Sequence, residues 1–93
     1  MTLIEQIANH YGLKDQCDQT IEEMAELTVA IRKFWRYSGY DADTINSLKD
    51  NIVEEIADVG IMLDQLQILF DVEKEVKVVR AEKLLRQKER MKA

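Results

Sequence analysis

The sequence predicts an all-α protein, a bundle of about four helices forming a single domain over residues 1–93. Three observations support this prediction. The chain has no proline and only three glycines, so few residues can interrupt a helix. Apolar residues recur at steps of three and four residues, the period of an amphipathic helix. The composition, 46% hydrophobic and 33% charged, is typical of a folded helical domain and not of a disordered chain.

The first predicted helix begins at Thr2, because Glu5, three residues later, completes a capping-box pattern. It ends near His10 and Tyr11, since Gly12 suits the position that follows a helix.

The second predicted helix covers residues 14–36 and is followed by a loop at residues 37–44, which are rich in turn formers. Its apolar stripe, at helical spacing, consists of Ile21, Met24, Thr28, Ile31 and Trp35.

The third predicted helix ends at about Phe70, and its start lies between Thr44 and Ser47. Its candidate N-caps are Asp43, Thr44, Asn46 and Ser47. Its apolar stripe consists of Leu48, Ile52, Ile56, Val59, Leu63, Leu66 and Phe70. A last helix over residues 72–92, capped by Asp71, completes the bundle. Because no glycine or proline marks this break, one continuous bent helix is the alternative.

Two acidic clusters, Glu-Glu-Met-Ala-Glu at residues 22–26 and Glu-Glu-Ile-Ala-Asp at residues 54–58, lie within these apolar patterns. Residues three apart share a helix face. If the two helices face each other, four carboxylates therefore converge, and like charges 4 Å apart repel by roughly 4 kcal/mol at an effective dielectric near 20. Oxygen ligands favour Mg²⁺, with Mn²⁺ as a substitute. The predicted metal ligands are Glu23, Glu26, Glu55 and Asp58.

A solvated acidic face is the alternative interpretation of the two clusters. A di-iron carboxylate site is nearly excluded, because it requires Glu-x-x-His on two helices. The only histidine of the chain, His10, lies outside both clusters.

Charge and composition exclude several classes of protein. The formal net charge is −5, which argues against nucleic-acid binding by charge alone. Residues 71–93 nevertheless carry 8 bases against 5 acids, so the last helix offers either a solvated basic face or contacts to phosphate. No apolar run reaches membrane-spanning length. A single cysteine and the absence of a signal-peptide pattern favour a cytoplasmic protein.

The acidic spacing also identifies a family resemblance. Glu22-Glu23-x-x-Glu26, followed after 28 residues by Glu55-x-x-Asp58, resembles the signature of the MazG-like all-α nucleoside triphosphate pyrophosphohydrolases. The resemblance implies Mg²⁺-dependent hydrolysis of a (d)NTP to the monophosphate and pyrophosphate, by attack of an activated water on the α-phosphorus. By this resemblance, the catalytic candidates are Glu22, Glu23 and Glu54, the metal ligands are the four carboxylates named above, and the candidate substrate contacts are Gln16, His10, Lys83 and Arg90.

Two other functions remain open from the sequence. Phosphoribosyl-ATP pyrophosphohydrolases are similarly short and helical, and a helical assembly or adaptor protein would carry the acids on solvated faces. We also expect a homodimer or a dimer of dimers, because 93 residues give a thin core. Further apolar residues lie outside the main stripes: Leu27, Val29, Phe34, Val53, Ile61, Met62 and Leu69.

Overall fold

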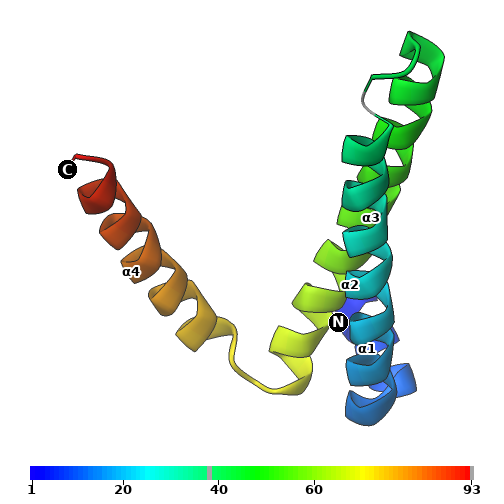
Figure 1. The fold of residues 1–93 in the computed structure, drawn as a ribbon. Helices are drawn as coiled ribbons and strands as arrows, with labels where there is room; N and C mark the ends of the chain where they lie inside the picture. The colour runs from blue at the N-terminus through cyan, green and yellow to red at the C-terminus, as the bar shows by residue number, and fades with distance from the viewer. Residues whose placement is uncertain (38, 93) are drawn as a thin grey trace.

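The computed structural model describes residues 1–37 and 39–92, so Ser38 of the predicted loop lies outside the described residues. The described residues form four helices and no strand, which confirms the predicted all-α fold: α1 (Leu3–Tyr11), α2 (Leu13–Arg36), α3 (Ala42–Leu69) and α4 (Glu73–Met91). The helices α2 and α3 run side by side in opposite directions, and α1 packs against both (Figure 1). Among the described residues, α4 packs only against α3 and extends away from the pair.

The first helix begins and ends as predicted. The Thr2 hydroxyl accepts a hydrogen bond from the backbone N–H of Glu5, and the Glu5 carboxylate accepts one from the backbone N–H of Thr2. Gly12 follows with a φ of 88°, a left-handed value that favours glycine. This single residue joins α1 to α2 and turns the chain between them.

The third helix begins earlier than predicted. Its N-cap is Asp41, whose carboxylate accepts a hydrogen bond from the backbone N–H of Thr44 at 2.8 Å. This bond lowers the pKa of Asp41, because it stabilises the charged carboxylate. The four predicted caps, Asp43, Thr44, Asn46 and Ser47, lie inside the helix, so that prediction was wrong.

A true break separates α3 from α4, and Asp71 is not the N-cap of α4. Asp71 has a φ of 54°, and its backbone N–H donates to the carbonyl of Ile68. The N–H of Val72 donates to the carbonyl of Gln67, which completes a Schellman motif at the end of α3. Asp71 therefore terminates α3, and the N-cap of α4 is Val72, without a side-chain hydrogen bond.

The face of α2 that packs on α3 differs from the predicted apolar stripe. Ile21 is 66% exposed and Trp35 is 71% exposed, and the other members of that stripe are exposed as well. Apart from Cys17, the buried or half-buried residues of α2 are Gln16, Thr20, Glu23, Leu27, Ala30 and Phe34. These residues recur at alternating steps of four and three, as in a coiled coil. The stripe prediction was wrong because this packed face includes polar residues.

The predicted stripe of α3 is half right. Leu48, Ile52, Val59 and Leu66 are half-buried, whereas Ile56, Leu63 and Phe70 are exposed. Among the described residues the only buried apolar side chains are those of Ala8, Ala30 and Met62. The interior of one chain is therefore thin.

No helix in the described ranges combines the length and the apolar character needed to cross a membrane.

A buried polar pair occupies the junction of α2 and α3 near α1. Gln65 is 2% exposed, and its Oε1 accepts a hydrogen bond of 2.6 Å from Nε2 of Gln16. The Gln65 amide nitrogen in turn donates to the sulfur of Met62 at 3.7 Å. Because buried amides without partners are costly, this pair fixes the register of the two helices.

We predict that Gln65→Met lowers the free energy of unfolding by about 1–3 kcal/mol, because it leaves the buried amide of Gln16 without an acceptor. The double variant Gln16→Met, Gln65→Met should recover most of this loss, since no polar group then remains unpaired. Urea unfolding measures both effects, with exposed Gln87→Met as the control. A double variant as unstable as the sum of its single changes would contradict the coupling.

Candidate metal centre

Three carboxylates meet where α2 faces α3. Glu23 and Glu55 are half-buried, and each lies on the face that its helix turns toward the other. Glu26, one turn after Glu23, is exposed beside them. One carboxylate oxygen from each of the three residues lies within 4.8 Å of the other two. The predicted convergence of the two acidic clusters is therefore present for three of the four predicted metal ligands.

No basic side chain of the described residues forms an ion pair with this cluster. Oε2 of Glu23 and Oε2 of Glu55 are shielded from solvent and have no hydrogen-bond partner. The other oxygen of Glu23 accepts a hydrogen bond of 2.9 Å from the amide of Gln19. The two ion pairs of the described residues are Lys14 with Asp18 and Lys92 with Glu89. No lysine or arginine of the described residues therefore neutralises the cluster.

The repulsion is visible in the pKa of Glu26, which is raised above its usual value. The main cause is the negative charge of Glu23, followed by that of Glu55. The folded state holds the proton of Glu26 more tightly than the unfolded state does. Protonation of Glu26 therefore stabilises the fold at low pH, and this stabilisation is lost as the pH rises through the raised pKa. A divalent cation fits this site, because it would supply the missing positive charge to oxygen ligands.

The other predicted acidic residues border the cluster without joining it. Asp58, one turn after Glu55, is exposed and lies outside the group of three. Glu22 and Glu54 are also exposed. The positions of Glu22 and Glu54 follow from the helix geometry, because neighbours in sequence point about 100° apart around the axis.

The structure does not bring the predicted substrate contacts to the cluster. Gln16 is buried and bonded to Gln65. His10 is exposed on α1, where its ring packs edge-on against that of Tyr11 at 4.7 Å between centroids. Lys83 and Arg90 are exposed on α4, the helix that extends away from the α2–α3 pair (Figure 1).

A surface pocket of about 330 Å³ adjoins the cluster on α2 and α3. Glu26 and Glu55 contribute to its wall, together with Lys33 and Asn51. The remaining lining residues are Ala25, Val29 and Ala30. Sequence reasoning missed Lys33 and Asn51. Their spacing could have indicated them, because residues a whole number of turns apart share a helix face. Lys33 lies two helical turns after Glu26, and Asn51 lies one turn before Glu55.

The chain matches no protein-family model, no curated protein and no solved structure. The resemblance to the MazG-like enzymes therefore rests on the sequence motifs.

We predict that Mg²⁺ or Mn²⁺ stabilises the folded protein, since an ion at 100 times its dissociation constant contributes roughly 2.7 kcal/mol. Glu55→Gln should reduce this response and should stabilise the metal-free protein, because it removes one of the mutually repelling charges. Thermal melts with and without EDTA measure both effects.

Asp64→Asn is the matched control, because Asp64 is an exposed acid of α3 outside the cluster and the charge change is the same. Its melting curve should respond to Mg²⁺ as the wild type does. A wild-type melting temperature that is unchanged in millimolar Mg²⁺ and Mn²⁺ would contradict the metal centre.

Proposed function

We propose that the protein is a divalent-metal-dependent nucleoside triphosphate pyrophosphohydrolase, which converts a (d)NTP to the monophosphate and pyrophosphate. The observation that carries the proposal is the convergence of Glu23, Glu26 and Glu55, with two shielded carboxylate oxygens that lack partners. Triphosphates reach such sites as magnesium complexes, which bring the positive charge that these carboxylates need. The spacing of the acidic motifs, which resembles that of the MazG-like enzymes, supports the same reaction.

In this proposal Glu23, Glu26 and Glu55 hold Mg²⁺, or Mn²⁺ in its place. The ion would neutralise charge on the phosphate oxygens and lower the pKa of a bound water. The exposed carboxylates of Glu22 and Glu54 border the cluster and can accept a hydrogen bond from the attacking water. The water oxygen would form a bond to the α-phosphorus and pass a proton to one of these carboxylates, while the bond from this phosphorus to the bridging oxygen breaks and pyrophosphate leaves with the electron pair.

We predict that the purified protein with Mg²⁺ releases pyrophosphate and the monophosphate together from at least one NTP or dNTP. Glu26→Gln should lower kcat/KM by roughly a hundredfold or more, because a catalytic metal ion supplies several kcal/mol of transition-state stabilisation. The assay is a panel of nucleotides that includes phosphoribosyl-ATP, with pyrophosphate and orthophosphate measured separately.

Asp64→Asn serves again as the control and should retain wild-type activity. Diphosphate and orthophosphate as the first products would contradict attack at the α-phosphorus. Cleavage of phosphoribosyl-ATP alone would identify the protein as a phosphoribosyl-ATP pyrophosphohydrolase instead. A protein that binds Mg²⁺ but cleaves no nucleotide would favour the assembly or adaptor role.

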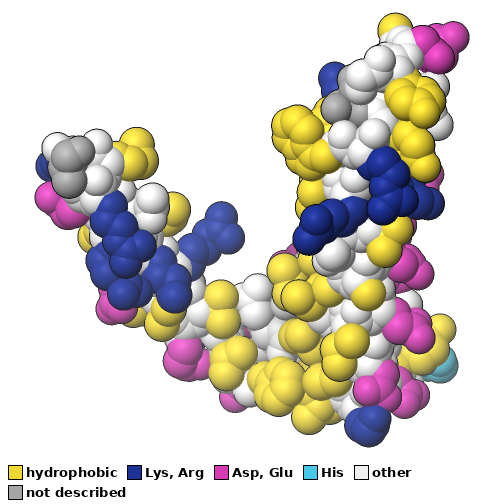
Figure 2. All heavy atoms as spheres, in the orientation of Figure 1, with side chains coloured by type: hydrophobic (Ala, Val, Ile, Leu, Met, Phe, Trp, Pro, Cys, Tyr) yellow, Lys and Arg dark blue, Asp and Glu magenta, His cyan; other side chains and the backbone are white. Residues whose placement is uncertain are grey.

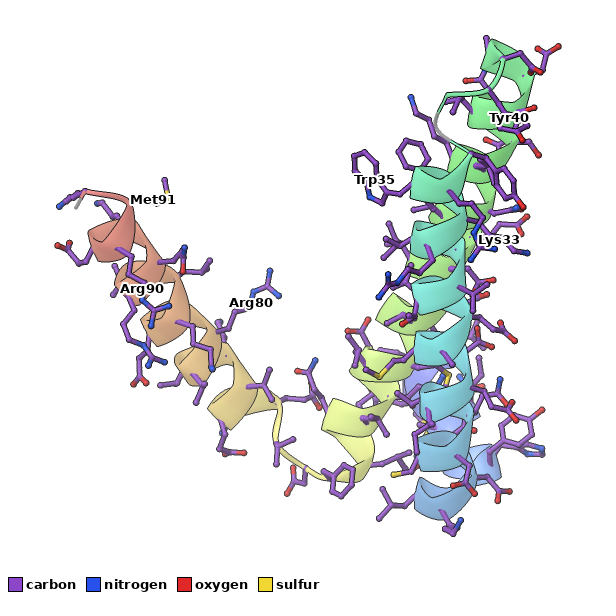
Figure 3. The ribbon with its side chains drawn as sticks, in the orientation of Figure 1. Lys33, Trp35, Tyr40, Arg80, Arg90 and Met91 are labelled. Carbon is purple, nitrogen blue, oxygen red and sulfur yellow. The ribbon has the colours of Figure 1, made fainter. Side chains whose placement is uncertain are left out.

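We also propose that the active species is a homodimer or a dimer of dimers. Exposed apolar side chains of α2 and α3 form one surface, which we call the apolar flank: Ile21, Met24, Ile31, Trp35, Val53, Ile56, Leu63 and Phe70. Helical spacing puts this flank on the opposite side of the pair from Glu26 and Lys33. Figure 3 shows Trp35 pointing to the side of α4, and Figure 2 shows apolar side chains gathered in the hollow between the two arms.

A second copy of the chain suits this surface. Among the described residues the buried apolar side chains are few and mostly small, whereas burying a large apolar side chain contributes roughly 1.5–3 kcal/mol. Val76 and Val79 of α4 are exposed as well. The lysines and arginines of α4 carry the charge opposite to the net charge of residues 1–70. Electrostatic attraction between two chains would therefore add to the burial of their apolar surfaces.

We predict that light scattering at micromolar concentration reports at least twice the 10.9 kDa mass of one chain. Ile56→Lys should shift the protein toward monomer, because it puts a charge in the apolar flank. Ile61→Lys is the matched control, since Ile61 is also exposed on α3 but lies about 140° away around the helix. A wild-type monomer, or equal effects of the two substitutions, would contradict this interface.

A further inference from the structure

We propose that Lys33, assisted by Asn51, binds the terminal phosphate of a nucleoside triphosphate and thereby selects triphosphates over diphosphates. The inference rests on the proposed function and adds a specificity-determining residue to it. Neither side chain belongs to an acidic motif, and both line the surface pocket that adjoins the carboxylate cluster.

The pocket has a direction set by the antiparallel helices. Lys33 follows Glu26 by seven residues, which is two turns and about 10.5 Å along α2, on nearly the same face. Asn51 precedes Glu55 by one turn. Because α3 runs opposite to α2, Asn51 and Lys33 lie on the same side of the cluster along the helix pair. The pocket thus begins at carboxylates and continues to an ammonium and an amide.

The chemistry of the lining identifies what this pocket fits. The Lys33 ammonium forms no ion pair or hydrogen bond with the described residues, so its charge is available to a ligand. The rest of the lining, Ala25, Val29 and Ala30, offers methyl and isopropyl groups and no competing charge. A ligand that occupies both ends needs one oxyanion for a cation at the carboxylates and a second for the ammonium. A polyphosphate chain meets this requirement, and lysine is a common phosphate-binding residue.

The proposed reaction determines which phosphate group of the nucleotide lies at which end of the pocket. Cleavage between the α- and β-phosphates requires these two groups at the carboxylate end, where the cation would be held. The γ-phosphate is the next group along the chain, and it extends toward Lys33 and Asn51. A nucleoside diphosphate has no group to put there. Lys33 should therefore contribute to the binding of triphosphates and little to that of diphosphates.

The test first identifies the nucleotide that the wild type cleaves fastest and then uses its α,β-methylene triphosphate and diphosphate analogues, which resist cleavage. Calorimetry with Mg²⁺ measures the affinity of both. Lys33→Met should weaken the triphosphate analogue about tenfold, the loss of one charge-assisted hydrogen bond. It should weaken the diphosphate analogue by less than about twofold. Asn51→Asp, which introduces a negative charge in the same volume, should act in the same direction, and Lys33→Arg should retain most of the affinity.

Arg32→Met is the matched control, because Arg32 is the neighbouring exposed cation of α2 and lies outside the pocket. It should leave both affinities within about twofold of the wild type, whereas a general effect of net charge would make it equal to Lys33→Met. Equal losses for the triphosphate and diphosphate analogues, or none, would overturn the role of Lys33 while pyrophosphate release still supported the proposed function. A wild type that cleaves no nucleotide would overturn both.

Discussion

Mutual repulsion among Glu23, Glu26 and Glu55 is the constraint on which the rest of this structure depends. Glu23 and Glu55 occupy positions of the α2–α3 interface at which an antiparallel helix pair ordinarily has apolar side chains. Each has a shielded oxygen without a partner, and their charges raise the pKa of Glu26. Unlike a solvated acidic face, this arrangement costs stability in the absence of a cation. The metal binding proposed above would offset this cost, and sites that break local folding rules are commonly functional.

The thin interior of the chain has the same origin. Gln16, Thr20 and Glu23 occupy half of the face that α2 turns to α3, and several large apolar side chains of α2 lie instead on the neighbouring flank. The two flanks of the pair are thus chemically different: one holds the carboxylates, Lys33 and the pocket, and the other offers an apolar surface. In the proposed dimer a second chain would cover the apolar flank without closing the pocket, so the proposed assembly and the proposed substrate access would not compete.

Much of the fold could be predicted from the sequence, because helix signals are local. The capping box at Thr2 and the turn at Gly12 were confirmed, as was the number of helices. The failures were tertiary or unusual. The packed face of α2 could not be predicted from hydrophobicity because half of its residues are polar. The break at Asp71 was misassigned because aspartate takes the left-handed position that usually belongs to glycine.

The candidate site was predictable to a similar extent, since spacing alone placed Glu23 with Glu26. That Glu55 joins them and Asp58 does not depends on how the two helices face each other. Crystals grown with Mn²⁺ and measured for anomalous scattering would test this account most directly. We expect an anomalous peak for Mn²⁺ within coordination distance of carboxylate oxygens of Glu23, Glu26 and Glu55. Converged carboxylates with no peak, compensated instead by protons or by a basic side chain of a second copy, would contradict it.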